Sequence, residues 1–256
     1  ARAGAAPLPL PTRRWRPPAP AGDGPRVVLM ADTFTRFLEP AVGDAAVRVL
    51  TAAGARVEVV DPGCCGRPLL SQGFVDAARR RARRALDRLA PHAMAGVPVV
   101  ILEPSCWSMM VDDLGNLLPH DPRAAWLAET ATTLEQACED LGGARFRGGA
   151  ERVVSHDHCH SRALGAGRTD AALARLTGAS VAASGAGCCG MAGAFGHLHP
   201  ELSRRIGEDR LAPAARDADV VVAAGTSCRA QVRRLTGRTA LHPAEFLAQQ
   251  LMEDPA

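Results

Sequence analysis

The chain has 256 residues, of which 47% are hydrophobic, so it can bury an ample core without disulfides or other cross-links. Its formal net charge is +3, from 30 basic and 27 acidic residues. This near balance excludes an overall electrostatic field that would attract nucleic acid. No apolar run in the sequence approaches the ~20 residues that a membrane-spanning helix needs.

Residues 1–25 differ in composition from the rest of the chain. They are crowded with Pro, Gly and Arg and show neither a helical nor an alternating pattern, which predicts a linker. The chain starts at Ala1 without an initiator Met, so we expect it to be the carboxyl-terminal part of a larger polypeptide. Trp15 stands among arginines, where packing on a neighbouring domain is favoured over contact with a membrane surface.

From residue 26, short β-branched runs alternate with helical segments, which predicts a parallel α/β sheet. Strands are predicted at 27–30, 57–60 and 97–103, and again at 152–156, 179–184 and 219–225. Helices are predicted over 41–54, about 74–90 and 107–141, with a last helix after His242-Pro243. The pattern therefore predicts two pseudo-repeated parallel-sheet halves, a first half at 26–142 and a second half at 151–256, joined by a connector at 143–150.

One cysteine pattern occurs in both halves. Gly63-Cys64-Cys65-Gly66 is followed by Cys106, and Gly187-Cys188-Cys189-Gly190 is followed by Cys228. The second cysteine of the pair lies 41 residues before the later cysteine in the first half, and 39 residues before it in the second. Soft thiolates that a duplicated fold brings together indicate a metal or cluster site.

The two halves differ by one cysteine. Aligning Val27 with Val153 places Thr33 opposite Cys159, so Cys159 has no thiol counterpart in the first half. All seven of these cysteines follow the carboxyl end of a predicted strand, the edge at which open α/β sheets bind ligands. We therefore expect the thiols of each half to converge.

The helices that follow the strands should favour thiolate. Ser105 and either Thr226 or Ser227 are predicted N-caps, which would place Cys106 and Cys228 in first helical turns. There, backbone N–H groups and the positive end of the helix dipole stabilise the negative charge of a thiolate.

The spacing favours an iron–sulfur cluster over the alternatives. Adjacent cysteines are poor disulfide partners because the short link strains the bond. Zinc sites usually contain a Cys-x-x-Cys spacing, which this sequence lacks. Neighbouring side chains diverge in extended backbone, so a cluster with several acceptor atoms suits the cysteine pair better than one small ion. Zinc stays open as an alternative.

Four thiolates are the complement of one cubane-type cluster, and the second half supplies them as Cys159, Cys188, Cys189 and Cys228. The first half supplies Cys64, Cys65 and Cys106 as a second candidate site. Three outcomes stay open there: a carboxylate such as Asp32 completes the site, the site is shared across the pseudo-twofold, or these residues are scaffold. Cys138 is expected to be a small hydrophobic residue buried on a helix.

Two further patterns stand beside the cysteines. Residues 185–190 spell G-x-G-x-x-G, the formal dinucleotide fingerprint. The equivalent loop of the first half keeps its cysteines but lacks the first glycine, so a nucleotide site is disfavoured. Strand alternation would point His156, His158 and His160 to one face and Cys159 to the other. Their roles stay open between hydrogen bonding to a cluster, proton transfer and packing.

Six motifs together resemble the duplicated cysteine-rich CCG domain: GCCGRPLLSQG, EPSCWS, HDHCHSRAL, GCCGMAGAFG, GTSCRAQ and LHPAEFL. This domain is shared by heterodisulfide reductase B-type subunits, by lactate-utilisation and glycolate-oxidase iron–sulfur subunits, and by the C-type subunits of anaerobic glycerol-3-phosphate dehydrogenases. The segments ADTFTRFLEP and GCCGMAGAFG are most similar to the carboxyl-terminal iron–sulfur region of large FAD-linked D-2-hydroxyacid (D-lactate-type) dehydrogenases. The resemblance spans about residues 26–251.

The resemblance implies an electron-transfer role. A [4Fe-4S] cluster would bind the four second-half cysteines, and the first half would be its degenerate twin. FAD would oxidise a 2-hydroxy acid such as D-lactate outside this segment, which would itself contain no catalytic residue. The implied partners are flavin and ferredoxin-like domains of the same polypeptide or complex, and a quinone or cytochrome acceptor. The implied location is cytoplasmic, or peripheral on the inner face of the membrane.

Two other functions stay open. One is a zinc-binding or metal-free scaffold that docks a flavin module. The other is a thiol–disulfide reductase subunit of the heterodisulfide type. Against the second, Gln231 and Met109 stand where the fullest reductase pattern has the last cysteine of a Cys-x-x-Cys.

Overall fold

A computed structural model describes residues 11, 13–20, 22–149, 151–166 and 168–252. The chain divides into two compact units, Pro11–Arg145 and a unit that begins at Phe146. Each unit contains one parallel sheet with helices around it, as the sequence predicted. We keep the names first half and second half for these two units.

The sheet of the first half has the strand order β2-β1-β3-β4, and all of its pairs are parallel. Its strands are β1 (Arg26–Met30), β2 (Arg56–Val60), β3 (Val99–Ile101) and β4 (Ala131–Thr132). The sequence analysis missed β4, because a two-residue strand inside a helical region leaves no periodic signal. Val28 and Leu29 in the central strand are fully buried, as expected for a parallel sheet covered on both faces.

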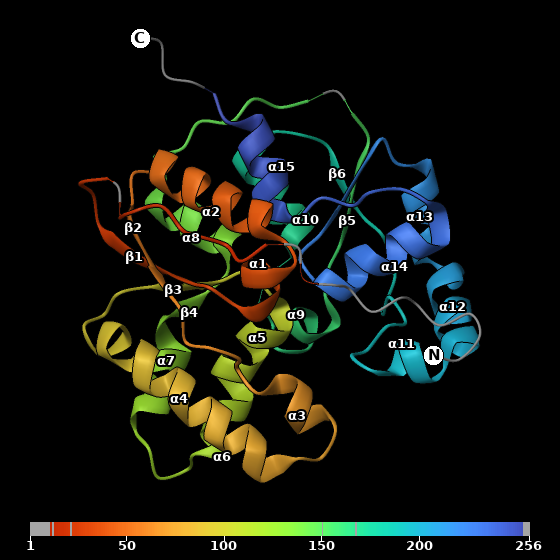
Figure 1. The fold of residues 1–256 in the computed structure, drawn as a ribbon. Coiled ribbons are helices and arrows are strands. Elements are labelled where there is room, and N and C mark those ends of the chain that lie inside the picture. The colour runs from red at the N-terminus through yellow and green to blue at the C-terminus, as the bar shows by residue number, and fades with distance from the viewer. Residues whose placement is uncertain (1–10, 12, 21, 150, 167, 253–256) are drawn as a thin grey trace. The chain divides into compact units, whose positions relative to one another are not determined.

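The helices of the first half lie on both faces of its sheet. Figure 1 shows α2 and α8 on one side of the strands and α4 and α7 on the other. The helical segments are α1 (Thr33–Phe37), α2 (Pro40–Ala52), α3 (Arg67–Ser71), α4 (Val75–Met94), α5 (Pro104–Ser108), a π-helical turn (Met109–Asp113), α6 (Leu114–Leu117), α7 (Arg123–Thr130) and α8 (Leu134–Leu141). Helix α4 buries Ala78, Ala82, Leu86 and Leu89 at helical spacing, which seats it on the core.

The second half repeats this plan with the strand order β6-β5-β7. Its strands are β5 (Val153–His156), β6 (Val181–Ala183) and β7 (Val220–Ala223), all parallel. Leu241 forms a single parallel bridge to Val222, in the place that β4 takes in the first half. The helices are α9 (Cys159–Ala163), α10 (Thr169–Thr177), α11 (Phe195–Leu198), α12 (Pro200–Asp209), α13 (Leu211–Asp217), α14 (Thr226–Thr236) and α15 (Pro243–Gln250). Helices α10 and α15 lie on one side of the strands, and α13 and α14 on the other (Figure 1).

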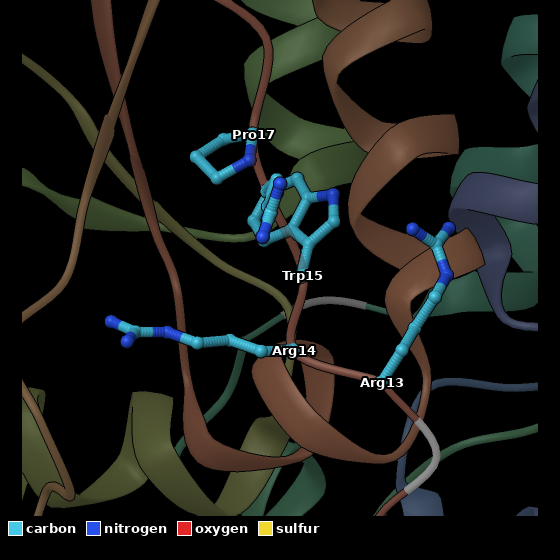
Figure 2. Close-up of a pocket in the computed structure, with 5 residues that line it drawn as sticks. Arg13, Arg14, Trp15 and Pro17 are labelled. Carbon is cyan, nitrogen blue, oxygen red and sulfur yellow. The ribbon is translucent and has the colours of Figure 1, made fainter.

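Trp15 is anchored within the first half. Its side chain is only 4% exposed, its backbone N–H donates to Arg36 O, and its indole Nε1 donates to Asp44 Oδ1 at 2.7 Å. A Cβ at Gly43 would come within 2.6 Å of the indole ring, so glycine makes room for it in α2. Arg13 and Arg14 extend away from the ring in different directions and stay exposed (Figure 2).

None of the described helices is both long and apolar enough to cross a membrane. The longest of them, α4, carries a row of arginines on its exposed side, with Arg79 paired to Asp76 one turn earlier. That face is therefore a solvated surface.

Candidate metal centre

The seven patterned cysteines follow the carboxyl ends of strands, as predicted. The pairs Cys64-Cys65 and Cys188-Cys189 lie in the loops after β2 and β6. Cys106 and Cys228 are the third residues of α5 and α14, which follow β3 and β7. Cys159 is the first residue of α9 after β5, and Thr33 is the first residue of α1 after β1. The alignment of Thr33 with Cys159 is confirmed.

The predicted N-caps of the two cysteine-bearing helices are wrong by one or two residues. Glu103, not Ser105, caps α5: its Oε1 accepts from Ser105 N at 3.3 Å and from Ser105 Oγ at 2.8 Å. Gly225 is the N-cap residue of α14. The error at α5 arose because Pro104 takes the first helical position, which moves the helix start forward. Cys106 and Cys228 still lie in first helical turns.

The four thiols of the second half form a chain of contacts. The thiol of Cys159 interacts with Cys188, Cys188 with Cys189, and Cys189 with Cys228. Cys189 and Cys228 are buried, whereas Cys159 and Cys188 are half-buried. The backbone N–H of Gly190 donates to Cys188 Sγ at 3.3 Å. The sulfurs therefore gather at one edge of the sheet, with one side of the group facing the surface.

His156 joins this group from the last position of β5. A ring nitrogen of His156 and the sulfurs of Cys189 and Cys228 all lie within 4.8 Å of one another. The His156 side chain is 1% exposed, and its Nδ1 lies 3.0 Å from Ser184 Oγ. The expectation that His156 and the cysteine would face apart is wrong, because the strand ends at His156 and α9 begins at Cys159.

His158 is the N-cap of α9, and its Nδ1 accepts from His160 N at 3.2 Å. An acceptor Nδ1 places the proton of a neutral imidazole on Nε2. A Cβ at position 225 would come within 2.4 Å of the His158 ring and 3.2 Å of Cys228 Sγ. Glycine at position 225 therefore lets the imidazole pack beside this sulfur.

The surroundings of the second-half thiols favour thiolate at two positions. A hydrogen bond from Cys189 and the proximity of His156 and His158 hold the pKa of Cys228 well below its usual range, despite its burial. Hydrogen bonds from Cys159 and Cys189, with the Gly190 N–H, lower the pKa of Cys188 in the same way. Those contacts raise the pKa values of Cys159 and Cys189, which hold the protons.

The first half brings its three cysteines together as well. Cys65 Sγ and Cys106 Sγ are 3.2 Å apart, and Cys64 interacts with Cys65. The Gly66 N–H lies 3.5 Å from Cys64 Sγ, and Thr33 contacts the same thiol. The thiols of the first half are thus arranged like those of the second, with the Thr33 hydroxyl in the place of the Cys159 sulfur.

Buried acids surround the first-half thiols. Asp32 is 1% exposed and caps α1: Oδ1 accepts from Phe34 N at 2.8 Å and Thr35 N at 3.1 Å, and Oδ2 accepts from Thr35 Oγ1 at 2.7 Å. Burial, opposed by these bonds, raises the pKa of Asp32 to about 6. The Cys65 thiol lowers the pKa of Cys106, but burial and the charges of Asp32 and Glu103 outweigh it, and the net pKa is raised.

The glycines that flank the cysteine pairs differ in how tightly their surroundings pack. Gly66 and Gly190 follow the pairs with φ of 94° and 89°, where a Cβ would come within 2.9 Å of Ala78 O and 2.4 Å of Ser203 O. These glycines let the two loops pack against α4 and α12. At Gly63 and Gly187, which precede the pairs, an added Cβ would meet nothing within 4 Å.

The remaining cysteine, Cys138, is 1% exposed on α8, and burial raises its pKa to about 12. This agrees with the prediction of a small buried hydrophobic residue. All eight cysteines are free thiols. The second half therefore offers four converging sulfur donors with a buried imidazole beside them, a donor set that fits a thiolate-bound metal cluster.

Comparison with known proteins agrees with this geometry. The family described as CCG, cysteine-rich domain, matches residues 31–111 and again residues 153–233. The chain belongs to this family. In this CCG chain, the first match begins directly after β1 and the second at the start of β5, and each includes all the patterned cysteines of its half. The family duplication is therefore the duplication of the fold.

Curated relatives of this CCG chain include three oxidoreductases or their components. It is 31% identical to a D-2-hydroxyglutarate dehydrogenase of Pseudomonas putida over 87% of the chain and 22% of that protein. It is 27% identical to the C-type subunit of the anaerobic glycerol-3-phosphate dehydrogenase of Escherichia coli, over 88% of the chain and 59% of that relative. It is also 27% identical to the glycolate oxidase iron-sulfur subunit of Escherichia coli, over 96% of the chain and 63% of that subunit. The chain thus spans less than two thirds of each of these proteins.

Proposed function

We propose that this chain is the iron–sulfur electron-transfer segment of a FAD-linked oxidoreductase that oxidises a 2-hydroxy acid. The cluster would be of the [4Fe-4S] type, held by Cys159, Cys188, Cys189 and Cys228. Four thiolates complete the ligand set of one such cluster. The observation that supports this most is the convergence of these sulfurs beside His156 and His158, which both act to lower the pKa of Cys228.

The electrostatic surroundings of the thiols favour the second half over the first as the site of a cluster. Ligand thiols must lose their protons when they bind metal, so groups that favour thiolate also favour binding. A hydrogen bond from the neighbouring thiol lowers the pKa of both Cys228 and Cys106. The imidazoles near Cys228 add to this effect, whereas burial and the charges of Asp32 and Glu103 outweigh it at Cys106. We therefore assign the cluster to the second half, and we assign Cys64, Cys65 and Cys106 to a scaffold that keeps the shape of the site.

The names of the relatives support the substrate class. One is a D-2-hydroxyglutarate dehydrogenase, one a glycolate oxidase iron-sulfur subunit, and another a lactate utilization protein A of Bacillus velezensis. All three names refer to 2-hydroxy acids. D-lactate and D-2-hydroxyglutarate are therefore the substrates to test first, with FAD and a ferredoxin-like module supplied by other domains of the same polypeptide or complex.

In this role the chain positions a redox centre and holds no substrate. A bound cluster accepts one electron at a time, whereas a flavin takes two from a hydroxy acid, so clusters connect a flavin to one-electron acceptors such as quinones or cytochromes. Cys159 and Cys188 leave one side of the site near the surface, which offers the route for electrons. We propose that the assembly lies in the cytoplasm or on the inner face of the membrane, near such an acceptor.

The experiment is metal analysis of the full-length protein purified without oxygen. We expect iron and sulfide at about four each per CCG chain, in addition to those of any ferredoxin-like module. Addition of D-lactate or D-2-hydroxyglutarate should then reduce the flavin and the clusters in turn. Iron-free protein would contradict the cluster, and reduction of the flavin without reduction of the clusters would contradict the relay.

One observation favours a zinc scaffold as the second candidate. His156, Cys189 and Cys228 have ligand atoms close enough to bind a single ion, and a further thiol from Cys188 would complete a tetrahedral set. One zinc per chain, with neither iron nor sulfide, would support that function. Thiol–disulfide exchange by the protein without iron would support the reductase function instead.

A further inference from the structure

The two halves differ at one cross-strand pair of residues beside the thiols, in which the residue on the first strand of the half is buried and its partner is half-buried. In the first half, Met30 at the end of β1 pairs in register with Val60 at the end of β2. In the second half, Ser155 pairs with Ala183, so the equivalent pair one residue further along is His156 and Ser184. An apolar pair therefore satisfies this fold, and the histidine is not required to build it.

A buried imidazole must be satisfied by hydrogen bonds, since burial of an unpaired polar group is unfavourable. His156 is 1% exposed, and its Nδ1 bonds to Ser184 Oγ at 3.0 Å. Among the described residues, its Nε2 is buried without a hydrogen bond of ordinary geometry, although the ring interacts with the Cys228 thiol and lowers its pKa. The neighbours that remain for Nε2 are the sulfurs of Cys189 and Cys228.

The bond to Ser184 bears on the protonation of the ring. Ser184 Oγ already accepts the N–H of Ala186 at 3.3 Å, and its own hydroxyl proton is free to be donated to His156 Nδ1. That arrangement places the ring proton on Nε2, facing the sulfurs. The opposite tautomer would direct a nitrogen lone pair at sulfurs that are anionic when they bind metal, which is repulsive.

We propose that His156 is a positioning residue that donates an Nε2–H···S hydrogen bond to Cys228 or Cys189, and that Ser184 fixes the tautomer that makes this possible. This inference rests on the proposed function, because its consequence is a higher reduction potential of the cluster. Hydrogen bonds to cluster sulfurs stabilise the reduced, more negative state. The first half, with Met30 in this place, has no such donor at the equivalent position.

The test is a redox titration of the cluster, followed by EPR, in the full-length protein and in His156→Met. Methionine copies the residue of the first half, so the variant keeps a buried apolar side chain of similar size. We expect full iron and sulfide content, and a fall of about tenfold in the ratio of reduced to oxidised cluster at a fixed potential. For a one-electron couple this is a shift of about 59 mV to more negative potential.

Three further variants sharpen the test. Ser184→Ala should also shift the cluster potential to more negative values, but by less than His156→Met does. Ser184→Thr keeps the hydroxyl and should have the wild-type potential. His156→Gln keeps an N–H donor and should fall between the wild type and His156→Met. His120→Met removes an exposed imidazole in the first half and should leave the potential unchanged.

The outcomes separate this inference from the proposed function. An iron-loaded His156→Met protein with the wild-type potential would overturn the inference alone. Loss of iron in His156→Met, with intact folding by circular dichroism, would make His156 a metal ligand and would also overturn it. If His156→Met does not fold, an unchanged potential in Ser184→Ala decides against the inference. A wild-type protein that binds no iron would overturn both.

Discussion

The two halves build the same frame around their thiols but place different side chains beside them, carboxylates in the first half and imidazoles in the second. Asp32 caps α1 in the first half, and His158 caps α9 at the equivalent place in the second. Glu103 precedes the helix of Cys106, whereas Gly225 precedes that of Cys228 and leaves room for the imidazole. Asp32 and His158 cap equivalent helices with their side chains, so the frame tolerates either chemistry at this place.

Under the proposed function, this difference would let a duplicated domain keep its shape while only one copy binds a cofactor. Carboxylates satisfy the helix ends of the first half and discourage thiolate formation at Cys106. Imidazoles satisfy similar needs in the second half and promote thiolate formation at Cys228. We therefore propose that the side chains beside the thiols select which half binds a cluster, although none of them is expected to be a ligand.

The largest effect should come from a matched pair of cysteine variants. Cys189→Ser removes a sulfur from the proposed cluster site, and we expect loss of most of the iron and sulfide bound to this chain. Cys65→Ser makes the same change at the equivalent place in the first half, and we expect full cluster content. Iron and sulfide analysis after anaerobic purification measures both. Equal losses in the two variants would break the contrast between the halves.

Removal of Trp15 should destabilise the first half. The buried indole and its bond to Asp44 are lost in Trp15→Ala, which we expect to lower the free energy of unfolding by about 3–5 kcal/mol. Urea titration of the anaerobic protein measures this, with Trp126→Ala as the control because Trp126 is 48% exposed. The cluster content of Trp15→Ala should remain full, and its loss would argue against assigning the cluster to the second half.

The glycines after the cysteine pairs offer a second matched comparison. Gly190→Ala forces a left-handed conformation on alanine and places its Cβ 2.4 Å from Ser203 O, so we expect a loss of about 3 kcal/mol in unfolding free energy. Gly66→Ala should cost less, because the corresponding contact is 2.9 Å. Gly187→Ala enters open space and should change stability little. Thermal or urea unfolding ranks the three, and a large loss in Gly187→Ala would contradict this packing.

The smallest effect concerns the buried acid of the first half. Because burial raises the pKa of Asp32 from 3.8 to about 6, its contribution to stability is fully present below pH 4 and is lost as the pH rises through 6. The whole loss should be about 3 kcal/mol, of which about half falls between pH 5 and pH 8. Asp32→Asn keeps a capping side chain and should remove this part of the pH dependence. Urea midpoints at pH 5 and pH 8 test it, and parallel profiles for the two proteins would contradict the shifted pKa.

Much of the fold could be read from local patterns. Short β-branched runs predicted the strands other than β4, because buried parallel strands have a continuous apolar signal. The repeated cysteine spacing predicted that Cys159 and Thr33 occupy equivalent places, since both follow the first strand of a half. Strand ends and helix caps were less accurate: the strand predicted at 97–103 is Val99–Ile101, and the cap of α5 is Glu103.

The sequence by itself determined the α/β class, the duplication and the set of thiols that gather at each sheet edge, because these follow from periodicity and from the rule that ligands collect at strand ends. The tertiary structure decided the environment of those thiols. His156 and Ser184 lie 28 residues apart, and their ring-to-hydroxyl bond beside Cys189 and Cys228 depends on strand register. Charge and hydrogen bonding act through space, so only the folded chain distinguishes a half that favours thiolate from one that opposes it.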